Sequence, residues 1–153
     1  MFPGATVFPE GLSIGSTFDL PLVKESLCQG EARSSGIHIL STLVLETDRD
    51  GRMGRNMEAY TEDPYLYSRI AENIVRGAQG TNVSAPDKVV ALMTDFPTQS
   101  KPASGLERGG AVEVSEQSIR ENFLPPWIAA FKARALEVMG VGDVVTPLLG
   151  FVF

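Results

Sequence analysis

The sequence predicts an α/β fold with a parallel sheet, and the order of its apolar segments is the main reason. Two apolar, branched runs, 37–45 and 88–93, are typical of strands buried on both faces, and each precedes a polar loop and a helix-like segment. A third strand candidate spans 136–141. Alternating strands and helices predict parallel pairing. A complete barrel needs about 200 residues or more. The 153 residues are therefore expected to form a partial (β/α)8 barrel of the TIM type.

The segments before the first strand predict a loop and one helix. Residues 2–18 are rich in Gly, Pro and Ser and are expected to form a loop with at most a short strand. Asp19 is a plausible N-cap of a helix that runs to about Ser34, with Pro21 near its first turn. Gly36 then supplies the left-handed residue after the helix.

The helices after the strands carry clearer start signals. Asp63 and Pro64 predict the start of a helix with an apolar stripe, which Gly77 and Gly80 are expected to close. After the second strand, Ser115 predicts the cap of a further helix. Pro125 and Pro126 should interrupt that helix, because proline removes a backbone donor, and it should resume from 126 to 134.

Composition narrows the class of protein. With 43% hydrophobic and 21% charged residues the chain is globular rather than disordered. A net charge of −6 and a pI near 4.8 argue against nucleic acid or an anionic membrane as the main partner. No apolar run approaches the roughly 20 residues of a spanning helix, and no signal peptide is visible. The single cysteine, Cys28, excludes an internal disulfide without fixing the localisation.

The polar loop after the first strand holds the most informative motif. Residues 48–66 read D-R-D-G-R-M-G-R-N-M-E-A-Y-T-E-D-P-Y-L. They resemble the signature R-D-P-R-W-G-R-x-x-E-x-x-G-E-D-P-Y-L of the glycoside hydrolase family 3 β-glucosidases and β-xylosidases, with Gly51, Met53 and Thr61 as the departures. Two more stretches are similar to that family, E-A-R with G-I-H within 31–38, and S-E-Q-S-I-R-E-N-F-L-P-P at 115–126. The resemblance covers about residues 8–139.

The resemblance implies a site for the sugar. Arg55 matches the arginine that binds the non-reducing-end sugar in the family, and its planar fork can donate paired hydrogen bonds to neighbouring hydroxyls. Thr94 and Asp95 stand where most members carry Lys-His, so an acceptor replaces two donors. We expect Arg55 and Asp95 to bind substrate. The alternative for Asp95 is that it orders the following loop.

The remaining charged side chains of the motif have a plainer interpretation. Arg49 and Arg52 are expected to pair with neighbouring acidic residues and hold the loop. Glu58 and Glu62 are expected to brace it rather than to catalyse.

The resemblance also implies what residues 1–153 lack. Retaining glycosidases use two carboxyl groups, a nucleophile and an acid/base. The family's nucleophile lies in a Ser-Asp-Trp after a late strand, which residues 150–153 only faintly resemble. We therefore expect an incomplete family 3 N-terminal catalytic domain over 1–153, with no catalytic residue and no hydrolysis by this chain alone. The alternatives are a non-catalytic sugar-binding relic and a non-functional remnant.

No cofactor or metal is expected. His38 has no Cys, Asp or Glu at ligand spacing and is expected to be a core histidine, while Cys28 is expected to be inert and Trp127 to anchor helix packing. The expected partner is a β-linked glycoside or oligosaccharide, with no nucleic acid and no membrane. A partial barrel also has an unpaired strand edge, and with the apolar segment 144–153 this predicts self-association.

Overall fold

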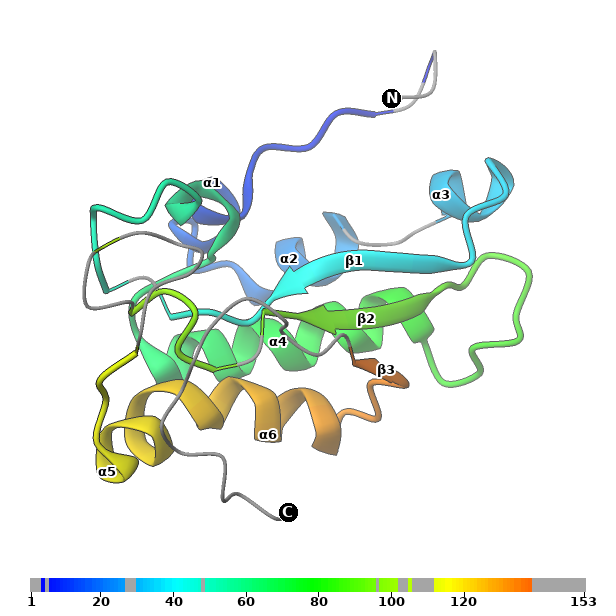
Figure 1. The fold of residues 1–153 in the computed structure, drawn as a ribbon. Coiled ribbons are helices and arrows are strands. Elements are labelled where there is room, and N and C mark those ends of the chain that lie inside the picture. The colour runs from blue at the N-terminus through cyan, green and yellow to red at the C-terminus, as the bar shows by residue number, and fades with distance from the viewer. Residues whose placement is uncertain are drawn as a thin grey trace.

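The computed structural model describes residues 4, 6–26, 30–47, 49–95, 97–101, 105 and 112–138. Helices and strands alternate along the chain, as predicted (Figure 1). The elements are α1 (Gly11–Gly15), α2 (Leu20–Ser26), α3 (Gly30–Ser34), β1 (Ile39–Val44), the 3-10 turn η1 (Asn56–Glu58), α4 (Pro64–Gln79), β2 (Val90–Thr94), α5 (Glu116–Ser118), the π-helical turn η2 (Ile119–Phe123), α6 (Leu124–Lys132) and β3 (Glu137–Val138).

The sheet has the topology of consecutive barrel strands. Its order is β1-β2-β3, and both pairs run parallel. Ile39 lies opposite Val90 and Val44 opposite Thr94, with an irregular register between them. The two strands therefore end side by side, which places the loops that follow them at one edge of the sheet. This arrangement confirms the predicted parallel α/β fold of partial-barrel type. The predicted third strand is described at 137–138, and its remainder lies outside the described residues.

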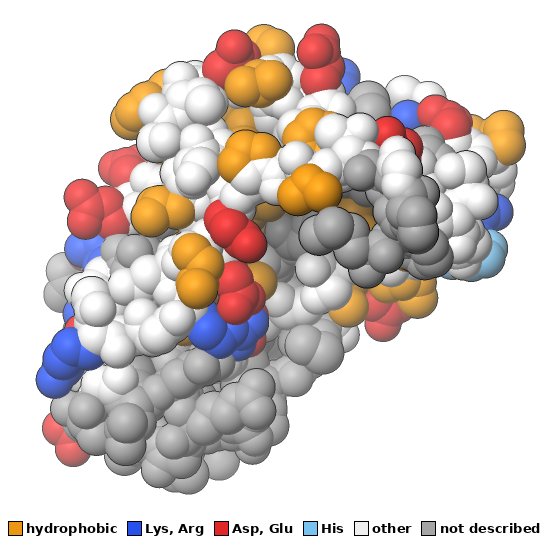
Figure 2. Space-filling view, turned by 90° about the horizontal axis from the view of Figure 1, so that it is seen from above, with side chains coloured by type: hydrophobic (Ala, Val, Ile, Leu, Met, Phe, Trp, Pro, Cys, Tyr) orange, Lys and Arg blue, Asp and Glu red, His pale blue; other side chains and the backbone are white. Residues whose placement is uncertain are grey.

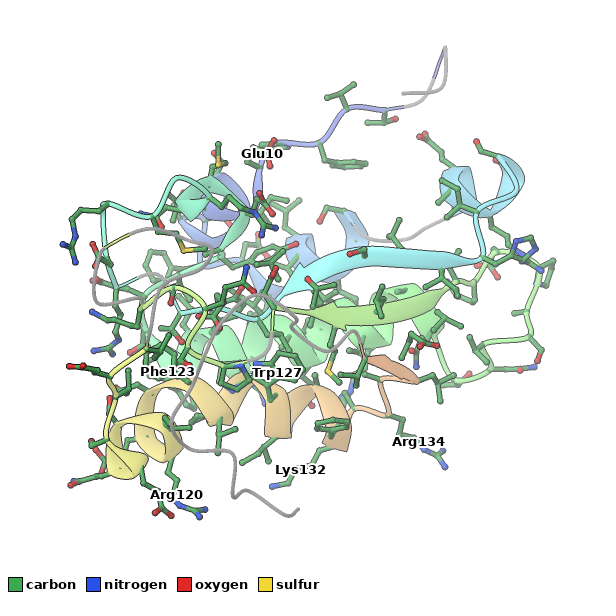
Figure 3. All side chains as sticks on the ribbon, viewed as in Figure 1. Glu10, Arg120, Phe123, Trp127, Lys132 and Arg134 are labelled. Atoms are coloured by element: carbon green, nitrogen blue, oxygen red, sulfur yellow. The ribbon has the colours of Figure 1, made fainter. Side chains whose placement is uncertain are left out.

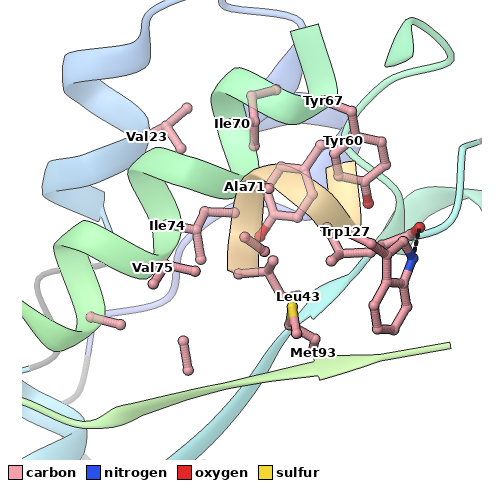
Figure 4. Close-up of a cluster of buried hydrophobic side chains, with 14 of the residues drawn as sticks. Val23, Leu43, Tyr60, Tyr67, Ile70, Ala71, Ile74, Val75, Met93 and Trp127 are labelled. Atoms are coloured by element: carbon pink, nitrogen blue, oxygen red, sulfur yellow. Dashed lines mark hydrogen bonds between the residues drawn. The ribbon is translucent and has the colours of Figure 1, made fainter. Parts of the chain in front are cut away.

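The core lies where α4 packs against the sheet and against its neighbours α2 and α6 (Figures 1 and 4). Burial of α4 follows the helical period, so one face meets the sheet. Tyr67 lies fully buried on this face, and its hydroxyl donates a hydrogen bond to the carbonyl of Val44 in β1. The Asp63 side chain accepts a hydrogen bond from the backbone N–H of Leu66 at 2.6 Å, which confirms the predicted cap.

The N-terminal region differs from the prediction in two ways. Residues 11–15 form α1 rather than a loop, and a Cβ on Gly15 would lie 1.8 Å from the carbonyl oxygen of Tyr60. This close packing against a distant segment stabilises a helix that local composition does not indicate. The structure also gives two helices, α2 and α3, between 20 and 34, with residues 27–29 outside the described part. Asp19 caps α2 through Leu22 N at 3.0 Å, and Gly36 has the expected positive φ of 83°.

The end of α4 corrects the prediction for its glycines. Gly80 follows the helix with φ 60°, as expected, whereas Gly77 lies inside it. A Cβ on Gly77 would lie 2.6 Å from the backbone oxygen of Lys24 in α2. Gly77 therefore permits two helices to approach closely, and does not terminate one.

The two prolines do not interrupt the last helical region. The chain stays helical from α5 through the π-helical turn η2 into α6, which begins at Leu124. Pro125 and Pro126 stand in the first turn of α6, directly after the π-helical turn η2, and the first turn is the part of a helix that tolerates proline. Ser115 accepts from Ser118 N at 3.2 Å, as predicted for its cap.

Three single-residue predictions have different outcomes. His38 is exposed just before β1, so the prediction of a core histidine is wrong. Trp127 is 2% exposed and points from α6 into the core, which confirms its role as a packing anchor (Figures 3 and 4). Cys28 lies outside the described residues.

Across the described part of the chain, every helix is too short or too polar to span a membrane.

Candidate functional site

Arg55 and Asp95 meet at the carboxyl edge of the sheet, where barrel proteins place their active sites. Arg55 lies in the loop after β1, and Asp95 directly follows β2. The Arg55 Nη1 and Nη2 atoms lie 3.5 and 3.4 Å from the two Asp95 carboxylate oxygens. The side chain of Arg55 is 27% exposed and that of Asp95 is 8% exposed. The structure therefore brings together the two residues that the sequence predicts to bind substrate.

Glu58 orients the Arg55 side chain. The Nε and Nη2 atoms of Arg55 donate to the two carboxylate oxygens of Glu58 at 2.7 and 2.5 Å, a paired contact that fixes the guanidinium plane. The hydrogen bond from Arg55 also lowers the pKa of Glu58 below its usual value. These contacts confirm that Glu58 braces the loop. The two contacts from Arg55 to Asp95 are longer, at 3.5 and 3.4 Å, so Glu58 is the closer partner of the guanidinium group.

The backbone that carries Asp95 is unusual. Asp95 has φ 60° and Thr98 has φ 88°, both in the left-handed region that residues with a Cβ seldom adopt. Such backbone persists only where surrounding contacts hold it, and it concentrates at functional sites. The Thr94 hydroxyl lies 3.2 Å from an Asp95 carboxylate oxygen and 3.5 Å from the carbonyl of Leu43. The Asp95 side chain is thus held at the end of β2.

Glu46 is a buried acidic residue at the same edge that the sequence analysis missed. One carboxyl oxygen accepts from Gln99 N at 3.1 Å, and the other accepts from Ser100 N at 3.1 Å and Ser100 Oγ at 2.6 Å. Burial raises the pKa of Glu46 to about 8, and the negative charge of Asp95 adds to this while the three hydrogen bonds oppose it. An acidic residue directly after the apolar run, before the motif, was the one available sequence signal.

The two neighbours of Glu46 bind other segments. The indole Nε1 of Trp127 donates to the carbonyl of Leu45 at 3.1 Å (Figure 4). The Thr47 hydroxyl donates to the carbonyl of Asn122 at 2.8 Å. The exit of β1 is therefore hydrogen-bonded to α6, to η2 and to the loop after β2. This edge of the sheet is held by side chains from distant parts of the sequence.

The other arginines of the motif have structural contacts. Arg52 pairs with Asp50 at 2.6 Å, and this contact lowers the pKa of Asp50 well below its usual range. The backbone carbonyl of Arg49 accepts from Lys101 Nζ at 3.3 Å, and the predicted pairing of the Arg49 side chain with acidic residues stays a prediction. Glu62 is exposed.

On the face in Figure 2, acidic and basic side chains lie among exposed hydrophobic ones. Within the described ranges, no group of three or more His, Cys, Asp or Glu residues could hold a metal.

Comparison with known proteins agrees with this geometry. Residues 1–146 match the model of the "Glycosyl hydrolase family 3 N terminal domain". This chain belongs to glycosyl hydrolase family 3. Its described strands, helices and βα loops are accordingly part of the N-terminal barrel domain of that family.

Similar proteins are glycosidases by name. The chain is 35% identical to a "Beta-xylosidase" of Formosa agariphila over 149 residues, which cover 94% of this chain and 20% of that protein. It is 29% identical to the "Periplasmic beta-glucosidase" of Salmonella typhimurium, covering 88% of this chain and 18% of that protein. The chain thus spans about a fifth of the length of the curated relatives it matches.

Solved structures give the same result for the fold. The β-glucosidase of Listeria innocua superposes with a TM-score of 0.86 at 32% identity, over 92% of this chain and 20% of that one. A β-glucosidase involved in saponin metabolism from intestinal bacteria superposes with a TM-score of 0.90 at 27% identity, over 96% of this chain and 20% of that one. The Listeria innocua enzyme has also been solved with glucose, isofagomine and gluconolactone.

Proposed function

We propose that this chain forms the sugar-binding part of a retaining β-glycosidase pocket. In this proposal Arg55 and Asp95 hold the terminal non-reducing glucosyl or xylosyl residue of a β-linked glycoside or oligosaccharide. One observation carries the proposal, namely that Arg55 is fixed by Glu58 while it faces Asp95 at 3.4 Å across the carboxyl edge of the sheet. The glycosidase names of the relatives support the same class of ligand.

The charges at this edge suit a sugar hydroxyl. Arg55 offers guanidinium donors, and the carboxylate of Asp95 offers acceptors. Contacts of 3.4 and 3.5 Å are longer than the about 2.9 Å of a usual N–H···O bond. A hydroxyl can therefore accept from Arg55 and donate to Asp95 without breaking the short pair between Arg55 and Glu58. A second candidate role is that Asp95 orders the loop after β2, which its positive φ favours.

The acidic side chains at this edge fit binding better than catalysis. Glu58 accepts two hydrogen bonds from Arg55, and Glu46 is fully buried with both oxygens occupied. A nucleophile needs a carboxylate that faces the anomeric carbon. We therefore propose that neither Glu46 nor Glu58 serves as nucleophile, and that the 153-residue chain by itself does not hydrolyse glycosides.

A titration with D-glucose and D-xylose tests the binding proposal. Both sugars should shift the ¹H–¹⁵N NMR signals of Arg55, Asp95 and their neighbours. In the variant Arg55→Lys the paired donors are lost, and affinity should fall about tenfold or more. The matched control is Arg69→Lys, which makes the same change in an ion pair with Glu72 on α4, away from this edge.

Two outcomes contradict the proposal. If neither sugar shifts any signal of the wild-type chain, the chain does not bind sugar. If Arg55→Lys and Arg69→Lys bind equally well, Arg55 is not the contact. The proposal on catalysis has a separate test, because measurable release of nitrophenol from 4-nitrophenyl β-D-glucoside by the purified chain would overturn it.

A further inference from the structure

We infer that Glu46 is a positioning residue for the sugar-binding edge, since it holds the loop after β2 in the geometry that presents Asp95 to Arg55. The inference rests on the proposed function and goes beyond it, because the hydrogen bonds given for Glu46 among the described residues go to Gln99 and Ser100 and not to Arg55 or Asp95. Its effect on binding would pass through the backbone of residues 97–100.

The first step is the pattern of hydrogen bonds. Glu46 accepts from two consecutive backbone N–H groups, those of Gln99 and Ser100, and from the Ser100 hydroxyl. These three donors belong to one short loop and converge on one side chain from the neighbouring strand exit. The Ser100 Oγ atom also lies 3.2 Å from the carbonyl oxygen of Thr47, which is an alternative acceptor for its one proton. The loop after β2 is therefore attached to the end of β1 chiefly by Glu46 and Ser100.

The second step is that this loop needs such an attachment. Asp95 and Thr98, on either side of the turn into the loop, both have φ in the left-handed region. An isolated chain avoids that conformation for residues with a Cβ, so it must be held by contacts elsewhere. Residues 98–100 are buried, which gives their backbone N–H groups no access to water as an alternative partner. Glu46 supplies two of the acceptors that this segment requires.

The third step connects the loop to Asp95. Gln99 and Ser100 lie four and five residues after Asp95, so a shift of their backbone passes directly to the strand end that carries the carboxylate. The two Arg55–Asp95 distances are already near the limit of hydrogen bonding. A small displacement of Asp95 would therefore separate the two sugar contacts, and small misplacements of binding groups have large effects.

The test compares variants of the full chain by amide hydrogen exchange and by glucose titration. Glu46→Gln replaces one carboxyl oxygen by an N–H donor, so the amide cannot accept from both Gln99 N and Ser100 N. We expect about tenfold faster exchange at one or both of these amides, and about tenfold weaker glucose binding. Ser100→Ala removes one of the three donors and should give a smaller change in the same direction.

The matched control is Thr47→Val. It removes a 2.8 Å hydrogen bond from the adjacent, equally buried residue, but that bond goes to Asn122 and not to the loop. Thr47→Val should lower stability while leaving exchange at residues 99 and 100, and glucose affinity, unchanged. A role of Glu46 in stability alone would make Glu46→Gln behave like this control.

The outcomes separate the two proposals. Faster exchange at residues 99 and 100 with glucose affinity within about twofold of wild type would overturn the positioning role and leave the proposed function intact. Unchanged exchange at these amides would also overturn it, since Glu46 would not hold the loop. If the wild-type chain binds no glucose, the proposed function fails and the positioning role falls with it, whatever the exchange rates show. Should Glu46→Gln not fold, Ser100→Ala decides with the same two measurements.

Discussion

Replacing Glu46 by glutamine should remove a pH dependence of stability that the wild-type chain has between pH 5 and pH 8. Burial raises the pKa of the Glu46 carboxyl from its ordinary value of 4.5 to about 8 in the folded chain. In that range the folded chain keeps the proton and the unfolded chain releases it. Raising the pH therefore favours unfolding, and the stabilisation present below pH 4.5 is lost as the pH rises toward 8.

The hydrogen-bond network can accommodate the protonated form, although its three donors by themselves favour the ionised one. The Ser100 hydroxyl lies within hydrogen-bonding distance of both Glu46 Oε2 and the carbonyl of Thr47, but it has only one proton. If the Glu46 carboxyl is protonated, it can donate to Ser100 Oγ, and the hydroxyl is then free to donate to Thr47. An ionised Glu46 would instead accept a hydrogen bond from the Ser100 hydroxyl. No proton would then remain for a hydrogen bond from that hydroxyl to the carbonyl of Thr47.

The expected change in the free energy of unfolding follows from the titration of a single group, the Glu46 carboxyl. Each pH unit between the two pKa values lowers the free energy of unfolding by about 1.4 kcal/mol, which is about 3 kcal/mol from pH 5 to pH 7. Glu58 and Asp50 have lowered pKa values, so their stabilisation is lost only below about pH 4.5 and does not change in this window. Burial keeps the pKa of Tyr67, which also faces Glu46, well above 10, so that tyrosine stays neutral.

Urea unfolding at several pH values measures the effect. Trp127 is the single tryptophan and is buried, so its fluorescence reports unfolding of the core. The free energy of unfolding of the wild-type chain should fall between pH 5 and pH 7, whereas that of Glu46→Gln should stay nearly constant. The control His38→Gln removes the one histidine, a side-chain type that titrates in this range, and should keep the wild-type slope. Parallel curves for the wild-type chain and Glu46→Gln would refute the reasoning.

Two further predictions concern contacts between distant segments. Gln79→Leu should lower the free energy of unfolding by about 2–4 kcal/mol, because the Gln79 amide donates to Arg134 O and accepts from Ala91 N and Leu136 N. The exposed control Gln117→Leu should change it by less than about 0.5 kcal/mol in the same urea titration. Gly77→Ala should destabilise by about 1–3 kcal/mol, although alanine favours helix, because the added Cβ would meet the backbone of Lys24. A higher melting temperature for Gly77→Ala by calorimetry would mean that α2 moves away without cost.

Much of the fold could be predicted because its signals are local. An N-cap side chain bonds to a backbone N–H three residues away, so Asp19, Asp63 and Ser115 mark helix starts in the sequence itself. Continuous apolar runs likewise indicate strands, as at β1 and β2, although the expected burial of both faces is wrong for the start of β1, where Ile39 and Ser41 are exposed. The parallel order followed from the alternation of these runs with helices.

The candidate site was predictable only in part. Arg55 stands in a motif with a recognisable pattern, and Asp95 follows a strand, so both could be named as binding residues before their distance was known. Glu46 could not be assigned in the same way. Its partners lie 53 and 54 residues further along the chain, and an acidic residue after a strand would ordinarily be expected to face solvent.

The sequence by itself determined the order of strands and helices, the positions of the caps, and the family motif that contains Arg55. Only the tertiary structure decided which of these residues meet. It buried Glu46 against the loop after β2 and brought Gly77 against α2. It also left His38 exposed just before β1. The reason is that caps and periodicity depend on neighbours within a few residues, whereas burial and close packing depend on segments that only folding brings together.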